Sequence, residues 1–170
     1  NYTGFKHIEI LGDVFKFNRE KIKFKGVNHH DSNPKTGYVM SAADIKKDLV
    51  LMKELNVNSI RTSHYPPDPM LLTLADIMGF YIIDEADIET HGCGSLGKYN
   101  IYKPNFLSND LSWAPRYIDR VNRMYFRDRN HPSITMWSLG NESGGYKCQD
   151  RCFEFLKSVC PEIPVHYEGV

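Results

Sequence analysis

Acidic, amide and imidazole side chains gather at the ends of the apolar segments of this 170-residue chain. The segment "SITMWSLGNES", residues 133–143, is apolar up to Leu139 and then carries Asn141 and Glu142. A carboxylate at the end of a buried strand is costly unless water, a cation or a ligand meets it. Further segments end in the same way, with the polar groups Asn28–Asp31, Arg61–Tyr65, Asp84–His91 and His166–Glu168.

These side-chain types suit a neutral ligand that carries many hydroxyl groups. Carboxylates accept hydrogen bonds from hydroxyls, and rings such as those of Tyr65, Trp137 and Tyr167 cover the apolar faces of a pyranose. Two carboxyl groups that flank a glycosidic bond supply acid–base catalysis and, in retaining enzymes, a nucleophile about 5–5.5 Å away. Glu142 is our first candidate for the acid. The alternative is that strand ends are simply wet, but wet loops favour Lys, Ser and Gly over so many His, Glu and Asn.

The composition is that of a globular protein without an obvious polyanionic or membrane partner. The chain is 41% hydrophobic and 25% charged, and its 21 basic residues balance 21 acidic ones. A net charge of zero creates no field toward nucleic acid, and no apolar run approaches the roughly 20 residues of a membrane helix. We expect reduced thiols and a cytoplasmic location from the four cysteines, because they lack the clustering of a zinc site; they are Cys93, Cys148, Cys152 and Cys160.

The spacing of apolar residues changes from a hairpin pattern to strands and helices in turn. Residues 1–22 are predicted to form a β-hairpin lead-in with its turn at Gly12-Asp13. Residues 23–170 are predicted to form the first half of a barrel domain. Four helices are expected. The first starts at Ser41, in a capping box with Asp44, and the second starts at Asp68-Pro69 and ends near Gly79. The third starts at Trp113, and the fourth covers residues 146–159.

About five strands alternating with four helices indicate an α/β fold with a parallel sheet and helices outside. Both a doubly wound sheet and a (β/α)8 TIM barrel fit this pattern. A complete barrel takes about 250 residues, so we expect roughly its first five strands and four helices here. In either case the polar strand ends lie on one face, where active sites form. Free sheet edges predict dimerisation or poor solubility for the isolated piece.

Five motifs together resemble the catalytic barrel of family 2 glycoside hydrolases, in particular the large bacterial-type β-galactosidases. They are "GVNHHD", "RTSHYPPDP", "DEADIETHG", "RDRNHPSITMWS" and "SLGNESG". The resemblance covers essentially the whole chain and implies a retaining glycosidase acting on terminal β-D-galactosides of the lactose type. Related β-glucuronidases also carry "RTSHYP" and "NE", but they tend to have "DEC" and "NEP" where this chain has "DEADIETHG" and "NES". Both differences favour a galactosidase, with another family 2 sugar specificity as the alternative.

The resemblance assigns roles to individual residues of the motifs. It implies that Glu142 is the acid/base and that Asn141 hydrogen-bonds the 2-hydroxyl of the sugar. His64 and His30 match residues that contact the sugar and stabilise the transition state. His29 stands where the family usually has Arg, and we expect this departure to change local packing more than chemistry.

The resemblance also implies a Mg²⁺ ion, accompanied by a monovalent cation in the full-length enzyme. Glu89 and His91 match its ligands, and Glu142 would touch the same ion. Two carboxylates suit a hard cation, and one imidazole is tolerable. The alternatives are a metal-free surface pair of Glu89 and His91, Glu142 as a helix cap, and His64 as a packed turn residue.

The family's nucleophilic glutamate lies on strand seven, beyond Val170, and Glu168 on strand five does not match it. We therefore expect the remaining barrel and flanking β-sandwich domains as partners in a homo-oligomeric full-length protein. We predict that residues 1–170 alone do not hydrolyse β-galactosides.

Other functional classes are a non-catalytic sugar-binding module and a dehydrogenase. "GCGSLG", residues 92–97, matches a dinucleotide fingerprint, but the "KYNIYKPNF" that follows does not predict the helix that such a site requires.

Overall fold

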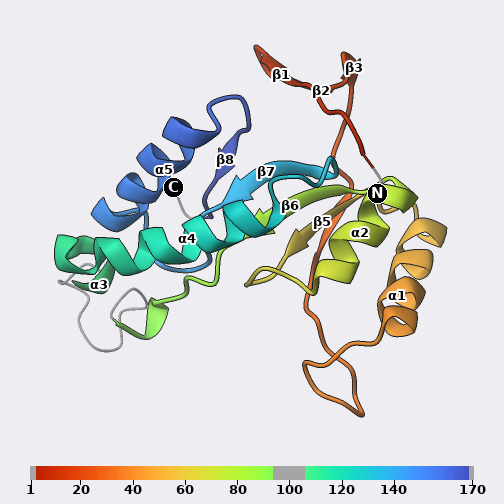
Figure 1. The fold of residues 1–170 in the computed structure, drawn as a ribbon, viewed down its shortest axis with the longest axis horizontal. Coiled ribbons are helices and arrows are strands. Elements are labelled where there is room, and N and C mark those ends of the chain that lie inside the picture. The colour runs from red at the N-terminus through yellow and green to blue at the C-terminus, as the bar shows by residue number, and fades with distance from the viewer. Residues whose placement is uncertain (1–2, 94–105, 169–170) are drawn as a thin grey trace.

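A computed structural model describes residues 3–93 and 106–168 of the chain, in two sheets (Figure 1). The first sheet is antiparallel and contains β1 (Ile8–Leu11), β2 (Val14–Phe17) and β3 (Glu20–Lys21). The second is parallel, and its strands follow one another in chain order: β4 (Gly26–His29), β5 (Ser59–Thr62), β6 (Tyr81–Glu85), β7 (Ile134–Ser138) and β8 (Val165–His166). This order, with helices between the strands, is that of a partial TIM barrel, as predicted.

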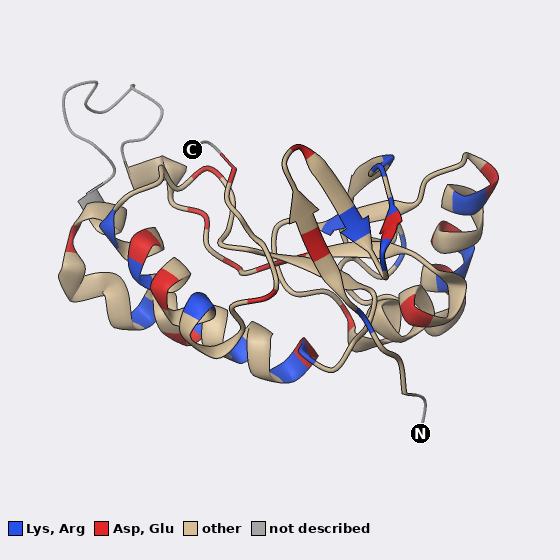
Figure 2. Cartoon of the chain, turned by 90° about the horizontal axis from the view of Figure 1, so that it is seen from above, with Lys and Arg blue, Asp and Glu red and all other residues tan. Residues whose placement is uncertain are grey.

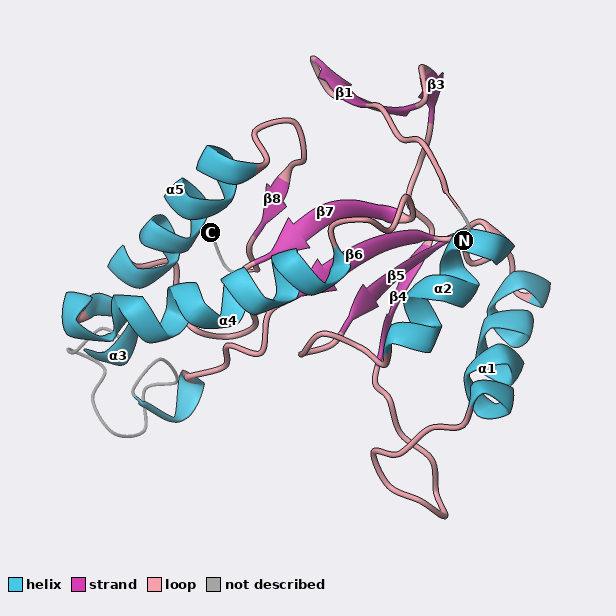
Figure 3. Ribbon diagram, viewed as in Figure 1, coloured by secondary structure: helices cyan, strands magenta, loops and turns pink. Residues whose placement is uncertain are grey.

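The long helices follow the strands one by one and lie on the outer side of the parallel sheet (Figure 3). They are α1 (Ala42–Glu54), α2 (Pro69–Met78), α4 (Ala114–Asp128) and α5 (Lys147–Val159). Short helical segments precede α4, namely η1 (His91–Cys93), α3 (Phe106–Asn109) and η2 (Leu111–Trp113). Figure 2 shows basic and acidic residues interspersed along the outer helices. No helix of the described residues is long and apolar enough to cross a bilayer.

The predicted helix ends are confirmed by their cap geometry. Ser41 and Asp44 form a reciprocal capping box at α1, with 3.1 Å between the Asp44 amide and the Ser41 hydroxyl. The Asp68 carboxylate accepts from the amide of Met70 at 2.8 Å and caps α2. Gly79 ends α2 with φ 75°, a conformation that glycine adopts at little cost. These local sequence features fix the start of α1 and both ends of α2.

The chain changes sheets between the hairpin and the barrel strands. The apolar residues of "KIKFKGVN" alternate, but the segment is not one strand, because β3 ends at Lys21 and β4 begins at Gly26. Phe24, between them, contacts Phe15 of the hairpin and Tyr81 of β6, at ring-centroid distances of 4.9 and 5.9 Å. The aromatic contact anchors the hairpin to the barrel sheet at the point where the chain passes from one sheet to the other.

The core lies between the parallel sheet and its helices. Each of the central strands contributes a fully buried isoleucine, and every long helix contributes apolar residues facing them; examples are Ile60, Ile82, Ile134, Leu49, Leu71, Val121 and Leu156. Cys148 and Cys152 are buried in this core, and burial raises the pKa of the Cys152 thiol to about 12. The four cysteines are free thiols, as predicted. Most of "GCGSLG" lies outside the described residues.

Candidate active site

The loops after β6 and β7 meet at the C-terminal end of the sheet. The amide of Asn141 donates to the carbonyl of Ile88 at 2.8 Å, and Glu89 and Asn141 form an isolated parallel bridge. Gly140 makes this approach possible, because its φ is 121° and a Cβ there would lie 2.4 Å from the Ile88 carbonyl oxygen. The bridge prolongs the β6–β7 pairing and brings the two predicted catalytic segments side by side.

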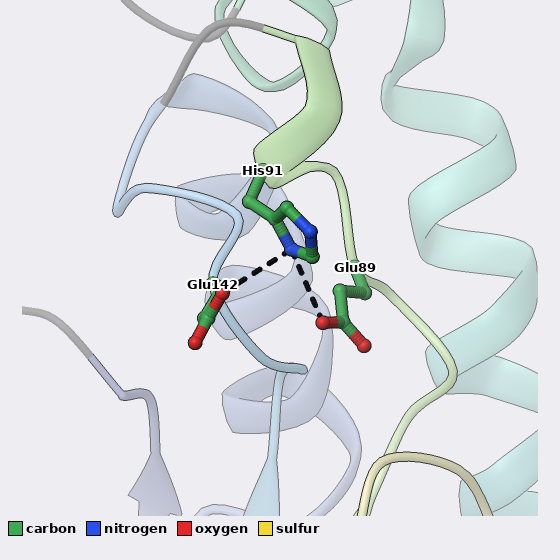
Figure 4. Close-up of side chains that lie close together, drawn as sticks. All are labelled: Glu89, His91 and Glu142. Atoms are coloured by element: carbon green, nitrogen blue, oxygen red, sulfur yellow. Dashed lines mark ion pairs between the residues drawn. The ribbon is translucent and has the colours of Figure 1, made fainter. Parts of the chain in front are cut away.

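Glu89, His91 and Glu142 converge, as Figure 4 shows. The Nδ1 atom of His91 lies 3.1 Å from Glu89 Oε1 and 3.2 Å from Glu142 Oε2. The three side chains offer ligand atoms within 4.8 Å of one another, and no other such group occurs in residues 3–93 and 106–168. The three residues that the sequence analysis grouped as one set therefore lie close together in the fold.

The chemistry of this cluster fits a cation. His91 Nδ1 is shielded from solvent but makes no well-formed hydrogen bond, although two carboxylate oxygens face it. Oxygen and nitrogen lone pairs that face one another repel unless a proton or a cation lies between them. Ligands about 2.0–2.1 Å from Mg²⁺ at adjacent octahedral corners lie roughly 3 Å apart, close to the separations found here. The donor set is therefore suitable for Mg²⁺.

Glu142 sits in an uncommon backbone conformation at the rim. Its φ is 41°, and its amide donates to the carboxylate of Glu168 at 3.1 Å. Its side chain is 48% exposed, so the carboxylate is accessible to a ligand. The next residue, Ser143, donates its amide to the hydroxyl of Tyr167 at 3.0 Å, and burial raises the pKa of Tyr167 to about 12. The loop that carries Glu142 is thus held by the segment after β8.

A second carboxylate, Glu85, is fully buried at the end of β6 and accepts hydrogen bonds from three residues. Arg61 donates from Nε at 2.6 Å and from Nη2 at 3.0 Å. His64 Nδ1 lies at 2.8 Å, and the Ser138 hydroxyl donates at 2.6 Å. Because an ionised carboxylate only accepts, His64 must carry its proton on Nδ1, which leaves Nε2 for another partner.

Arg61 connects Glu85 with the rim cluster. Its Nη2 atom also donates to Asn141 Oδ1 at 3.0 Å, and Asn141 Nδ2 donates to Glu89 Oε1 at 3.3 Å. The chain of contacts from Glu85 to Glu89 fixes the orientation of the Asn141 amide. Sequence reasoning noted Arg61 and Glu85 as polar strand ends but gave them no role. The strand register that places Glu85 beside Ser138 could have revealed the pairing.

A cavity of about 560 Å³ lies beside these residues, lined by His30, Tyr38, His64, Tyr65 and Glu89. The rings of His30 and His64 meet edge to face at 5.3 Å, so the two histidines that the resemblance assigned to the sugar are neighbours. His29 points elsewhere, and its Nε2 lies 3.1 Å from the Asp48 carboxylate of α1. Tyr38 was not singled out by sequence reasoning.

One expectation about a strand-end residue is wrong, and a second residue, to which no role was assigned, has a polar partner. Trp137, which we expected to face a sugar, is buried in the core and packs on Tyr125 at 5.5 Å, so that prediction is wrong. His166 received no role, but its Nδ1 lies 3.0 Å from the Ser138 hydroxyl. Burial, with the nearby charge of Arg61 as a second cause, lowers the pKa of His166. His166 thus extends the Glu85 contacts to β8.

Comparisons with a family model and with individual proteins point to the same family. The family model described as "Glycosyl hydrolases family 2, TIM barrel domain" matches residues 8–170. A β-galactosidase from Pectobacterium atrosepticum is 43% identical over 98% of this chain, and one from Aeromonas hydrophila is 42% identical over 98%. These alignments cover 15% and 16% of the two relatives. The chain thus spans a small part of the length of the curated relatives it matches.

Solved structures share the fold at lower identity. A β-D-glucuronidase from Dictyoglomus thermophilum superposes with a TM-score of 0.85 and 27% identity, over 97% of this chain and 29% of that one. A GH2 β-galacturonidase from Eisenbergiella tayi gives a TM-score of 0.75 and 27% identity, over 97% and 28% of the two chains.

Proposed function

Because the chain belongs to glycoside hydrolase family 2 and forms part of its TIM-barrel domain, we propose that the protein hydrolyses terminal β-D-galactosides with retention of configuration. The observation that carries this proposal is the convergence of Glu142 with Glu89 and His91 at the C-terminal end of the strands. The names of the two curated relatives support galactose as the sugar.

In the proposed reaction Glu142 donates a proton to the glycosidic oxygen as the bond between this oxygen and the anomeric carbon breaks. The nucleophile, a second carboxylate, forms a covalent bond to the anomeric carbon; we expect it outside these residues. Glu142 then takes a proton from water as the water oxygen bonds to the anomeric carbon. The bond between that carbon and the nucleophilic carboxylate breaks in the same step, which frees the sugar and restores the carboxylate. The 48% exposure of Glu142 leaves its carboxylate free to meet the substrate.

Asn141 and His64 would hold the sugar during this reaction. The Asn141 amide is oriented by Arg61 and Glu89, so a 2-hydroxyl would meet a fixed group. His64 is oriented by Glu85, and its Nε2 remains for a sugar hydroxyl in the cavity that it shares with His30. Groups held before the substrate arrives cost little reorganisation in the transition state.

Glu89, His91 and Glu142 would hold a Mg²⁺ ion at the rim. When bound, the ion supplies positive charge beside two carboxylates that otherwise repel one another. The protein's own contribution is to orient Glu89 through its contact with Asn141.

The test uses the full-length protein that carries this sequence and two substrates that differ in their leaving group. In Glu142→Gln, kcat/KM for methyl β-galactoside should fall by about 10²–10⁴-fold, because this leaving group needs a proton. The kcat/KM for dinitrophenyl β-galactoside, which reports the steps up to departure of a leaving group that needs no proton, should be affected much less. Glu154→Gln is the matched control, since it makes the same change at an exposed carboxylate on the outer helix α5. An equal loss with both leaving groups would refute the assignment of Glu142 as the acid.

A second candidate is a β-glucuronidase, favoured by the TM-score of 0.85 with the Dictyoglomus enzyme. The relatives at 42–43% identity weigh more than this likeness at 27%. Assays of the same enzyme with nitrophenyl β-galactoside and nitrophenyl β-glucuronide separate the two. A higher kcat/KM for the glucuronide would reject the galactosidase.

A further inference from the structure

Tyr38 is an exposed aromatic residue placed at the predicted sugar site. It lies in the loop between β4 and α1 and is 80% exposed, yet its side chain lines the cavity that also contains His30, His64 and Glu89. Tyr65 lines the same cavity and is half-buried. The cavity therefore has polar residues on the side of the strands and a tyrosine ring at its solvent side.

The loop that presents Tyr38 is closed by its own hydrogen bonds. Asn33 and Gly37 exchange both backbone hydrogen bonds, at 2.8 and 2.9 Å. The Asn33 side chain accepts from the amide of Lys35 at 2.8 Å, and the Thr36 hydroxyl donates to the carbonyl of Val39 at 2.6 Å. Gly37 has φ 67°, which closes the turn directly before Tyr38. A preorganised loop binds a ligand with little loss of conformational entropy.

We propose that Tyr38 forms the binding subsite for the leaving group of the glycoside, where its ring stacks on a pyranose or an aromatic ring. This inference rests on the proposed function. An enzyme that removes a terminal sugar encloses that sugar and leaves the rest of the substrate toward solvent. His64, whose side chain is 21% exposed, belongs to the enclosed part, and Tyr38 belongs to the open part. Aromatic faces stack on flat apolar ring faces in this way.

Charge also separates this subsite from the reacting centre. Glu89 and the histidines bring ionisable groups to the strand side of the cavity, whereas Tyr38 is followed by the apolar, exposed Val39. The part of the substrate that meets Tyr38 therefore gains from contact with an apolar face rather than from ion pairing. The chemical class that fits is an uncharged ring, such as the second sugar of a disaccharide or a phenyl group.

The test compares substrates with and without a ring in the leaving group, in the full-length enzyme. In Tyr38→Ala, KM for lactose and for nitrophenyl β-galactoside should rise about two- to tenfold, the effect of losing one stacked ring. KM and kcat for methyl β-galactoside should stay unchanged. Tyr38→Phe, which keeps the ring, should retain the wild-type KM. Val39→Ala is the matched control, because Val39 is 72% exposed and adjacent but does not line the cavity.

Each outcome decides the inference. An unchanged KM for all substrates in Tyr38→Ala would overturn it, and so would an equal rise for methyl β-galactoside, because Tyr38 would then contact the terminal sugar. Wild-type enzyme that turns over no β-glycoside would overturn the proposed function and the subsite together. A wild-type enzyme that is active, together with a Tyr38→Ala variant whose KM values are all unchanged, would overturn the subsite alone.

Discussion

Glu85→Gln is the substitution that most directly tests how the site is held together. Glu85 is fully buried, and its two oxygens accept two hydrogen bonds each. Oε1 accepts from Arg61 Nη2 and His64, whereas Oε2 accepts from Arg61 Nε and Ser138. Glutamine keeps the shape of the side chain but replaces one oxygen by an amide group that donates.

Either orientation of the new amide loses one contact to Arg61. If the amide faces His64, the imidazole can move its proton to Nε2 and accept, but Arg61 Nη2 loses its partner. If it faces Ser138, the hydroxyl can accept, but Arg61 Nε loses its partner. A lost charge-assisted bond costs about 1.5–3 kcal/mol, and breaking a buried ion pair costs about 3–5 kcal/mol. We expect a loss near 3 kcal/mol, within these ranges.

The assay is kcat/KM for nitrophenyl β-galactoside together with the midpoint of thermal unfolding, both on the full-length enzyme. If between half and all of this free energy is lost from transition-state stabilisation, because Asn141 and His64 are less well oriented, kcat/KM falls about tenfold to 10²-fold. Glu154→Gln is the control, since Glu154 makes an exposed pair with Arg151 at 2.7 Å and such pairs contribute at most about 1 kcal/mol. The same kcat/KM and the same unfolding midpoint in the two variants would refute the role of Glu85.

Two further predictions concern the rim loop and a buried acid. Gly140→Ala should lower kcat at least tenfold, because its Cβ would lie 2.4 Å from the carbonyl oxygen of Ile88 and displace Asn141; Gly12→Ala, with φ 63° and no atom within 4 Å, should leave kcat unchanged. Burial, then the Asp128 carboxylate, raises the pKa of Asp84 well above its usual 3.8, so the folded state keeps this proton where the unfolded state has lost it. Stability therefore falls as pH rises through 3.8 toward the folded pKa, and Asp84→Asn should unfold at a higher temperature than wild type by a margin that grows from pH 4 to pH 7. Thermal scans across this pH range check it, and a margin independent of pH would contradict it.

Most of the fold could be predicted from the sequence because local chemistry specifies it. Ser41 with Asp44, and Asp68 before Pro69, mark helix starts by hydrogen bonds that form within a few residues. A common rim for the loops that carry Glu89, His91 and Glu142 followed from their position at strand ends, since parallel strands end at the same edge. The resemblance to family 2 glycoside hydrolases, and not the alternation of strands and helices, selected these three residues as one set.

The remainder depended on tertiary contacts that a single sequence does not display. Glu85 faces Ser138 only because β6 and β7 are neighbours in one particular register. Trp137 was misplaced because β7 is buried on both faces, so its apolar residues show no preference for one side. Tyr38 could not be assigned to the site from the sequence, because its position depends on a turn closed by Asn33 and Gly37. The spacing of apolar residues does not indicate this turn.

Glu85 and Glu142 differ in burial and in hydrogen bonding, and this difference supports the roles that we propose for them. Glu85 has no exposed surface, and donors from β5 and β7 and from the loop after β5 occupy both its oxygens. Such a carboxylate could protonate a substrate only by giving up partners that hold Arg61 and His64 in place. Glu142 is held through its backbone amide, and its carboxylate meets one imidazole nitrogen and solvent. It can therefore exchange a proton without disturbing its support. In the proposed reaction the buried carboxylate would therefore orient the site, and the exposed one would transfer the proton.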